Sequence, residues 1–224
     1  MSKGKLIAIG GTDASGKETQ TKLLVHKLNL ANIPCKYISF PMYGTPTGKI
    51  VGGALLGKQS ISKSYFENPA EVDSKTASLY YAADRHYNKK IMEDTLNSGT
   101  HLISDRYVES NMGHQGGKIK NPEERLKFFK WLEDLEYGLL QLPKPDLTIL
   151  LYMPYKVGME LKSKMGVEKD EVEKNIDYLK NSEESYLQLA KLYNWKKVDC
   201  IKNGELRTKE DISDEVYNIV RKII

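Results

Sequence analysis

The chain has 224 residues, of which 40% are hydrophobic, and its 34 Lys and Arg residues outnumber its 30 Asp and Glu residues to give a formal net charge of +4. This length and hydrophobic fraction predict a single globular domain spanning residues 1–224. The positive charge is small and interleaved with acidic residues, which argues against a nucleic-acid partner but suits small anionic substrates.

The sequence pattern predicts neither a signal peptide nor a membrane span. The first apolar run, residues 6–9, is too short for the apolar region of a signal peptide, and no stretch approaches the ~20 apolar residues of a membrane span. Cys35 and Cys200 are isolated in the sequence and lie beside predicted strands, so we expect buried thiols rather than a metal or redox site. A cytoplasmic protein without a membrane partner is therefore expected.

Short apolar runs alternate with amphipathic stretches along the chain. The predicted strands cover residues 6–9, 37–40, 101–104, 146–152 and 195–201. The predicted helices cover residues 19–29, 47–56, 73–97, 122–140, 177–193 and 209–223. This alternation predicts an α/β fold with three layers, doubly wound around a five-stranded parallel sheet. In such folds ligands bind beyond the carboxyl ends of the strands.

A glycine-rich loop joins the first predicted strand to the first helix. Gly11 and Gly16 have the spacing of a phosphate-binding loop, and Lys17 follows directly. Backbone N–H groups and the positive helix end can bind phosphates there, and the lysine adds a charge for the terminal phosphates. The pattern predicts a P-loop NTPase type of fold and an ATP site formed by Gly11, Thr12, Asp13, Ala14, Ser15, Gly16, Lys17, Glu18 and Thr19.

One position of this loop departs from the usual pattern. A Ser or Thr normally follows the lysine and helps to hold Mg²⁺, whereas here Glu18 follows it and Thr19 comes next. A carboxylate can ligate Mg²⁺ but adds negative charge beside the phosphates. Thr19 is turned by about 100° along the helix from that position. The sequence leaves Glu18 and Thr19 as alternatives.

Two further groups of residues can serve a nucleotide. Asp105 and Arg106 follow the third strand, where an Asp can hold Mg²⁺ and an Arg can bridge two phosphate groups. Tyr81 and Arg85 are four residues apart on a predicted helix and so share a face. An aromatic ring beside a guanidinium can stack on a base and donate a hydrogen bond to its edge.

Taken together, these motifs resemble the thymidylate kinase family of P-loop nucleoside-monophosphate kinases. The resemblance extends from about Leu6 to Trp195. It rests on the P-loop with its acidic Asp13, on Phe40-Pro41, on Tyr81 with Arg85, on Asp105-Arg106-Tyr107 with Ser110-Asn111, and on Leu142-Pro143-Lys144-Pro145-Asp146.

The resemblance implies transfer of the γ-phosphate of Mg–ATP to dTMP, which gives dTDP and ADP for dTTP synthesis. It implies that Lys17, Arg106 and Asp13 are the catalytic residues and that Mg²⁺ lies near Asp105, with Glu18 as a second candidate ligand. A homodimer is also implied. The implied dTMP-binding residues are Asp13, Phe40, Tyr43, Tyr81, Arg85, Arg106, Ser110 and Asn111.

Three features depart from the family pattern. Met42 stands where many relatives carry an Arg. The expected mobile lid, at about residues 159–175, offers three lysines and no Arg, and a lysine clamps phosphate less rigidly. Val172 stands where relatives often have a Tyr that helps to exclude ribose, so the selection against ribonucleotides stays open. The three lid lysines are Lys162, Lys164 and Lys169.

Two alternative functions remain at this point. The chain can be a kinase for a different nucleoside monophosphate or for a deoxynucleoside, or it can be a nucleotide-binding P-loop protein with weak catalysis. The presence of Asp13, Lys17, Arg85, Asp105 and Arg106 argues against the second alternative, because a decayed enzyme would have lost some of them.

Overall fold

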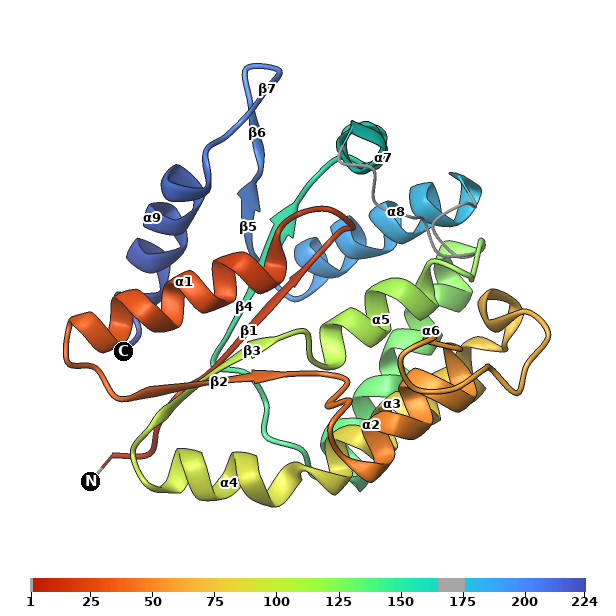
Figure 1. The fold of residues 1–224 in the computed structure, drawn as a ribbon, viewed down its shortest axis with the longest axis horizontal. Helices are drawn as coiled ribbons and strands as arrows, with labels where there is room; N and C mark the ends of the chain where they lie inside the picture. Colours follow the sequence, from red (N-terminus) through yellow and green to blue (C-terminus); the bar gives the residue numbers. More distant parts are fainter. Residues whose placement is uncertain (1, 165–175) are drawn as a thin grey trace.

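The computed structural model describes residues 2–164 and 176–224. Its centre is a five-stranded sheet in the order β2-β3-β1-β4-β5, in which every neighbouring pair is parallel (Figure 1). The predicted doubly wound α/β fold is therefore confirmed. The strands are β1 (Leu6–Gly11), β2 (Cys35–Ser39), β3 (His101–Asp105), β4 (Leu147–Tyr152) and β5 (Lys196–Asp199).

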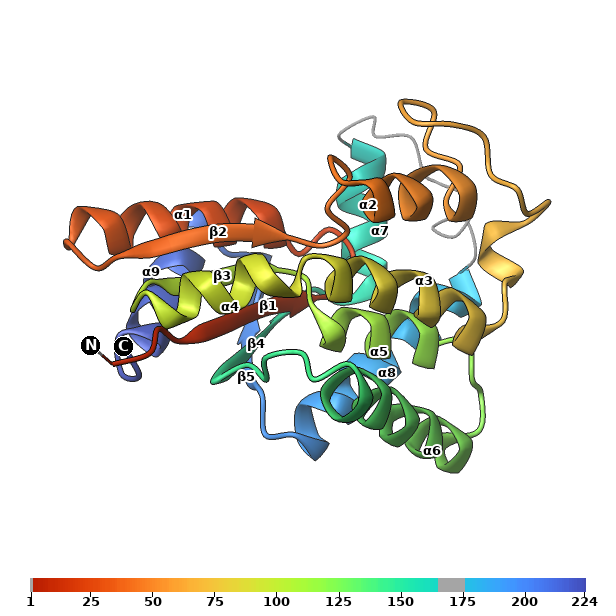
Figure 2. The same cartoon turned by 90° about the horizontal axis from the view of Figure 1, so that it is seen from below.

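Helices cover both faces of the sheet (Figures 1 and 2). One face carries α1 (Lys17–Leu30) and α9 (Lys209–Val220). The other face carries α4 (Lys89–Asn97), α5 (Val108–Gly116), α6 (Pro122–Glu133) and α8 (Ile176–Leu192). Three more helices lie beyond the carboxyl ends of the strands in Figure 2, namely α2 (Pro46–Ile50), α3 (Ser74–Tyr87) and α7 (Tyr155–Lys164).

The central strand β1 contributes side chains to two separate cores. Leu6 and Ala8 pack on the side of α4, α5, α6 and α8, whereas Ile7 and Ile9 pack on the side of α1 and α9. This alternation follows from the two-residue period of a strand, and burial on both faces explains why β1 is apolar throughout. Cys35 and Cys200 are buried free thiols in the second core, as predicted.

Several predicted helices differ from the observed ones. The expected helix over residues 73–97 is two helices, α3 and α4, which meet at Asn88. The Asn88 side chain is buried and donates to the Asp84 backbone oxygen at 2.8 Å, which offers the backbone an alternative to a continuous helix. The helices starting at Pro46 and Pro122 both continue into π-helical turns, η1 (Val51–Leu55) and η3 (Asp134–Leu139).

Two helices and one hairpin were not predicted. The α5 and α7 segments are rich in Gly and polar residues and show no clear apolar stripe. The last predicted strand stops at Asp199, and a hairpin of β6 (Ile201–Lys202) and β7 (Glu205–Leu206) follows. Asn203 and Gly204 form its turn with φ of 53° and 83°, the conformation that an Asn-Gly pair favours. Within the two described ranges, no helix combines the length and apolarity that crossing a membrane requires.

The first turn of α5 carries a buried carboxyl group. Glu109 is 3% exposed, and neither of its carboxylate oxygens has a hydrogen-bond partner among the described residues. A methyl group on Gly10 would lie 3.2 Å from Glu109 Cγ, so the glycine leaves room for this side chain against β1. Burial raises the pKa of Glu109 from 4.5 to about 7.

This pKa predicts how stability depends on pH. The folded protein holds the Glu109 proton more tightly than the unfolded chain, so its free energy of unfolding falls as the pH rises from 4.5 to about 7. Glu109→Gln removes this titration. We expect the stability of the variant relative to wild type to rise by about 2 kcal/mol between pH 5 and pH 8, measured by urea unfolding. A relative stability that is the same at both pH values would contradict this account.

Candidate nucleotide-binding site

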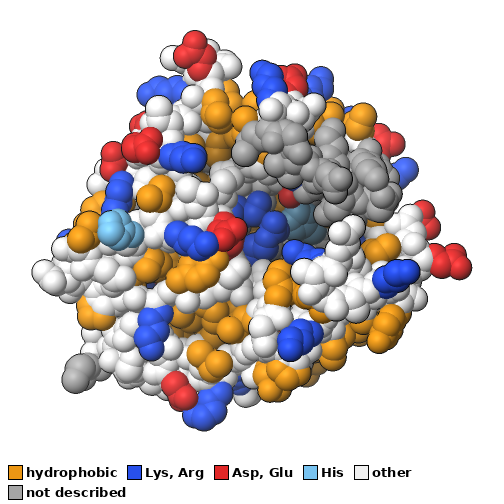
Figure 3. Space-filling view, in the orientation of Figure 1, with side chains coloured by type: hydrophobic (Ala, Val, Ile, Leu, Met, Phe, Trp, Pro, Cys, Tyr) orange, Lys and Arg blue, Asp and Glu red, His pale blue; other side chains and the backbone are white. Residues whose placement is uncertain are grey.

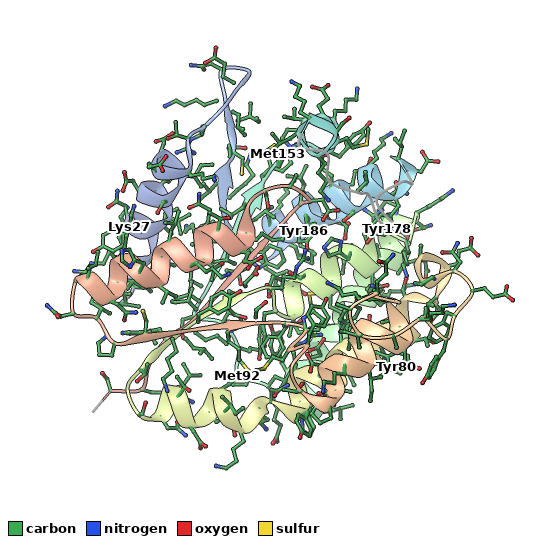
Figure 4. The ribbon with its side chains drawn as sticks, in the orientation of Figure 1. Lys27, Tyr80, Met92, Met153, Tyr178 and Tyr186 are labelled. Carbon is green, nitrogen blue, oxygen red and sulfur yellow. The ribbon has the colours of Figure 1, made fainter. Side chains whose placement is uncertain are left out.

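The glycine-rich loop between β1 and α1 is held in a fixed shape. Ala14 and Gly16 take left-handed conformations, with φ of 59° and 74°. Thr12 Oγ1 donates to the backbone oxygen of Met153 at 2.6 Å, which ties the loop to the residue after β4 (Figure 4). Lys17 Nζ donates to the Thr12 backbone oxygen at 2.8 Å. The lysine is thus folded back over the loop that the phosphates would occupy.

Lys17 is a buried cation whose side chain hydrogen-bonds, among the described residues, only to the Thr12 backbone oxygen. It is 7% exposed, and burial together with the nearby Arg106 lowers its pKa to about 7. The carboxylates of Asp13 and Asp105 oppose this shift, but the pKa stays lowered, so burial and repulsion between the two cations outweigh them. The placement of the two cations therefore favours binding of a polyanion.

A cavity of about 420 Å³ opens beside this loop, beyond the carboxyl ends of β2, β3 and β1. In Figure 3, Lys and Arg side chains gather at a hollow near the middle of the molecule. The cavity brings together residues from distant parts of the sequence, from Asp13 to Tyr178. Ten of the predicted site residues line it: Asp13, Glu18, Phe40, Tyr43, Tyr81, Arg85, Asp105, Arg106, Ser110 and Asn111.

Arg106 is oriented by a histidine that the sequence reasoning missed. Arg106 Nη1 lies 3.0 Å from His114 Nε2, and His114 Nδ1 lies 3.1 Å from the Tyr178 hydroxyl. Burial, opposed by Asp13 and reinforced by Arg106, lowers the pKa of His114 to about 3, so the ring is neutral. Because a guanidinium can only donate, Nε2 is the acceptor and Nδ1 carries the proton toward Tyr178.

The helix α8 closes the other side of this histidine. Tyr178 stacks on the His114 ring with 9° between the planes, and Tyr186 meets it edge-on at 89°. Both tyrosines are labelled in Figure 4 and come from α8. Arg106 itself has φ of 64°, a left-handed conformation that directs the chain from β3 into α5. The Arg106 side chain is therefore fixed from two elements at once.

Asp13 carries negative charge in the centre of these cations. Burial alone raises the pKa of Asp13, but the surrounding basic groups together lower it below its usual value, namely His114, Lys17, Arg106 and Lys162. Lys162, on α7, lines a small recess with Asp13 and is half-buried, whereas Lys164 is exposed. Two other predicted positions of this region, Lys169 and Val172, lie outside the described residues.

The residues proposed for Mg²⁺ differ in their surroundings. Asp105 is 6% exposed; its Oδ1 has no hydrogen-bond partner within residues 2–164 and 176–224, and its Oδ2 accepts from the Tyr37 hydroxyl at 3.4 Å. A buried carboxylate oxygen left open in this way fits a hard cation. Glu18 is exposed and pairs with Lys22 at 2.5 Å. Thr19 is exposed and does not line the cavity.

The far end of the cavity is aromatic. Phe40 is buried and its ring lies 5.8 Å from that of Tyr107, and the Phe40–Pro41 peptide is cis. Tyr81 and Arg85 both line this end, as their spacing predicted. Arg85 is paired with Glu136, a residue absent from the sequence-based predictions, through two bonds of 2.5 and 2.6 Å.

Further residues of the cavity were not anticipated. Lys58 lies over the Tyr43 ring at 4.2 Å, and Lys118 donates to the Val72 backbone oxygen at 2.8 Å. Burial lowers the pKa of Lys118 to about 8. Lys58 thus supplies positive charge beside Tyr43, the residue that follows Met42. His114 lies on α5, which the sequence pattern did not predict, so no spacing argument pointed to it.

The sheet order, the loop and the cavity define a P-loop NTPase-like α/β protein. The thymidylate kinase family model matches residues 9–212. The chain is 30% identical over 223 residues to the probable thymidylate kinase of Methanocaldococcus jannaschii, and the match covers 100% of this chain and 99% of that protein. It is 33% identical over 229 residues to the thymidylate kinase of Prochlorococcus marinus, and the match covers 99% of this chain and 98% of that protein.

A solved structure of thymidylate kinase from Candida albicans is also similar. Its TM-score is 0.76 at 26% sequence identity, and the match covers 99% of this chain and 93% of that one. With the family match, this similarity confirms both the fold and the resemblance that the motifs indicated. The chain belongs to the thymidylate kinase family.

Gly48 packs closely against the loop that carries Met42 and Tyr43, and this loop forms part of the cavity wall. A methyl group on Gly48 would lie 1.8 Å from the Met42 backbone oxygen, whereas one on Gly44 would meet nothing within 4 Å. We expect Gly48→Ala to displace this wall, to cost about 2 kcal/mol of stability and to weaken nucleotide binding, as measured by thermal unfolding and calorimetry. Gly44→Ala is the matched control and should resemble wild type. Equal behaviour of the two variants would show that the wall tolerates the clash.

Proposed function

We propose that the protein transfers the γ-phosphate of Mg–ATP to dTMP, producing dTDP and ADP. The observation that carries this proposal is the single cavity that joins Arg106, beside the P-loop, to an aromatic end lined by Tyr81 and Arg85. A phosphate donor and a base-bearing acceptor can meet there end to end. Membership of the family supplies the reaction class.

At the donor end, the P-loop amides and Lys17 bind the phosphates of ATP. Lys17 gives up its bond to the Thr12 carbonyl and gains the terminal phosphates in exchange. Bound phosphate restores its full positive charge, because an anion stabilises the protonated form. Lys162 approaches from α7 and adds charge near Asp13.

At the centre, Arg106 contacts the transferred and the accepting phosphates. Phosphoryl transfer depends on in-line placement and on neutralised charge, and the acceptor phosphate needs no general base. The bond to His114, whose ring is held in turn by the Tyr178 hydroxyl, keeps the guanidinium in place before substrate arrives. Asp13 orients the acceptor beside these cations, and Tyr43 and Ser110 line its path.

Mg²⁺ fits beside Asp105, whose Oδ1 is unpartnered among the described residues. The ion, when bound with ATP, neutralises charge on the phosphate oxygens. Glu18 would have to leave Lys22 to serve as a ligand. Asp105 is therefore the residue that we assign to the metal.

At the acceptor end, Phe40 and Tyr81 pack against the base and Arg85 donates to a ring carbonyl oxygen. Such a pocket suits thymine and also admits uracil, which loses only the methyl contact, worth about 1–3 kcal/mol. The alternative function, phosphorylation of another monophosphate or of a deoxynucleoside, shares the donor end. It differs in the acceptor that this pocket would select.

The chain acts, in this proposal, as one kinase domain over residues 1–224 whose lid includes α7. It works as a cytoplasmic homodimer in dTTP synthesis. Exposed leucines on neighbouring helices support the dimer, namely Leu79 on α3 and Leu126 on α6.

A panel of acceptors tests the function directly. With Mg–ATP, we expect dTMP to be the best substrate and dUMP to be used at about a tenth of its kcat/KM or less, because only the methyl contact is lost. The ribonucleotide of thymine, dCMP and thymidine complete the panel in a coupled ADP-release assay. A better rate with thymidine or with a purine monophosphate would favour the alternative.

The role of Arg106 is tested by its removal. Arg106→Ala should lower kcat by at least about a hundredfold with the fold intact, since a preorganised charge of this kind contributes roughly 2–4 kcal/mol to the barrier. Arg221→Ala, at the exposed end of α9, is the matched control and should keep wild-type turnover. Near-normal turnover of the Arg106 variant would remove this residue from the site.

A further inference from the structure

Glu136 is a buried carboxylate at the base end of the cavity. It lies in the π-helical turn η3 and has no exposed surface. Its two oxygens accept hydrogen bonds from Arg85 Nε and Nη2 at 2.5 and 2.6 Å. An ionised carboxylate can only accept hydrogen bonds, so every group that faces Glu136 has to be a donor.

This pairing determines how Arg85 meets a ligand. The guanidinium is 2% exposed; burial alone would lower its pKa, but the charge and hydrogen bonds of Glu136 outweigh burial and raise it. Nε and Nη2 are occupied by the carboxylate, while Nη1 makes no hydrogen bond within the described ranges. Arg85 lines the cavity, so Nη1 is the donor that remains for a carbonyl oxygen of a base.

The same carboxylate orients Asn111. The Asn111 amide nitrogen, Nδ2, lies 3.3 Å from Glu136 Oε1 and 3.4 Å from the Ser78 backbone oxygen. Because both of these partners are acceptors, the NH₂ group has to face them. The amide oxygen, Oδ1, then faces the Ser78 hydroxyl at 3.3 Å. That hydroxyl makes a shorter bond of 2.6 Å to the Ser74 backbone oxygen, so Oδ1 keeps capacity to accept.

We propose that Glu136 is a positioning residue that fixes the donor and acceptor pattern of the pocket, with Arg85 donating and Asn111 Oδ1 accepting. This pattern matches a pyrimidine that has a ring N–H beside a carbonyl, as thymine and uracil do. Cytosine presents a bare ring nitrogen and an amino group at the same edge, and both would be mismatched. Glu136 thus selects keto over amino pyrimidines without touching the base, an inference that rests on the proposed function.

The test compares ratios of kcat/KM for dTMP, dUMP and dCMP. We expect wild type to prefer dTMP over dCMP by about 10⁴-fold, because a mismatched pocket leaves buried polar groups unpaired. Glu136→Gln replaces one of the two accepting oxygens by a donating NH₂ group. The Asn111 side-chain amide can then flip, so that its nitrogen and oxygen exchange places. The dTMP to dCMP ratio should fall at least about tenfold. The dTMP to dUMP ratio should stay unchanged, because the two bases have the same hydrogen-bonding edge.

Comparing the two ratios separates positioning from simple damage. A merely structural role of Glu136 would lower all three kcat/KM values in parallel and leave both ratios at their wild-type values, which would overturn the inference. Glu133→Gln is the matched control: that carboxylate lies at the end of α6, 3.4 Å from both Lys144 Nζ and the Tyr193 hydroxyl, and it does not line this cavity. It should leave every value unchanged.

A second variant covers the case in which Glu136→Gln does not fold. Glu136→Asp keeps a carboxylate that can accept from Arg85, on a side chain shorter by one methylene. The carboxylate then moves away from the Asn111 amide nitrogen, which in wild type is already 3.3 Å from Glu136 Oε1. We expect the dTMP to dCMP ratio to fall here too, with the dTMP to dUMP ratio retained. If wild type phosphorylates dTMP and the variant keeps both ratios, only the inference fails. If wild type does not phosphorylate dTMP, the proposed function fails and the inference with it.

Discussion

Lys17 and Arg106 are two positive groups held close together in the interior, and the site depends on this arrangement. Each lowers the cost of binding an anion by being in place beforehand, yet burial and the repulsion from Arg106 bring the pKa of Lys17 down to about 7. The protein bears this cost because neighbouring strands, β1 and β3, end at the same edge of the sheet and deliver both residues there. A chain of phosphates is the partner that would relieve the repulsion.

The rest of the fold keeps these two cations from moving apart. Thr12 ties the P-loop to the end of β4, and His114 with Tyr178 ties Arg106 to α5 and α8. The neutral state of His114 is essential to this arrangement, since a protonated ring could not accept from a guanidinium. At the opposite end of the cavity, Arg85 bonds directly to the Glu136 carboxylate, whereas Lys17 bonds to the Thr12 backbone oxygen. The donor end therefore favours an anionic ligand. At the base end the charge of Arg85 is neutralised by Glu136, which suits an uncharged ring.

Much of this organisation could be predicted from the sequence, because it is encoded by local patterns. The strands and the P-loop follow from apolar runs and glycine spacing, and ten predicted residues do line one cavity. What escaped prediction depends on contacts between distant segments. Glu136 lies about fifty positions from Arg85. In the sequence it is one of several polar residues of a predicted helix, and nothing local marks it as the partner of Arg85. The α5 helix carries His114 and Glu109, and it was missed because it is buried almost all round and so has no apolar stripe.

The central claim is that phosphates of two nucleotides meet at Lys17 and Arg106. A crystal structure of the protein with dTMP and a non-hydrolysable ATP analogue tests it most directly. We predict that Lys17 Nζ will leave the Thr12 carbonyl for the terminal phosphate of the analogue, and that the Arg106 guanidinium will lie between that phosphate and the phosphate of dTMP. A complex in which both nucleotides are bound while either side chain contacts no phosphate would contradict the account.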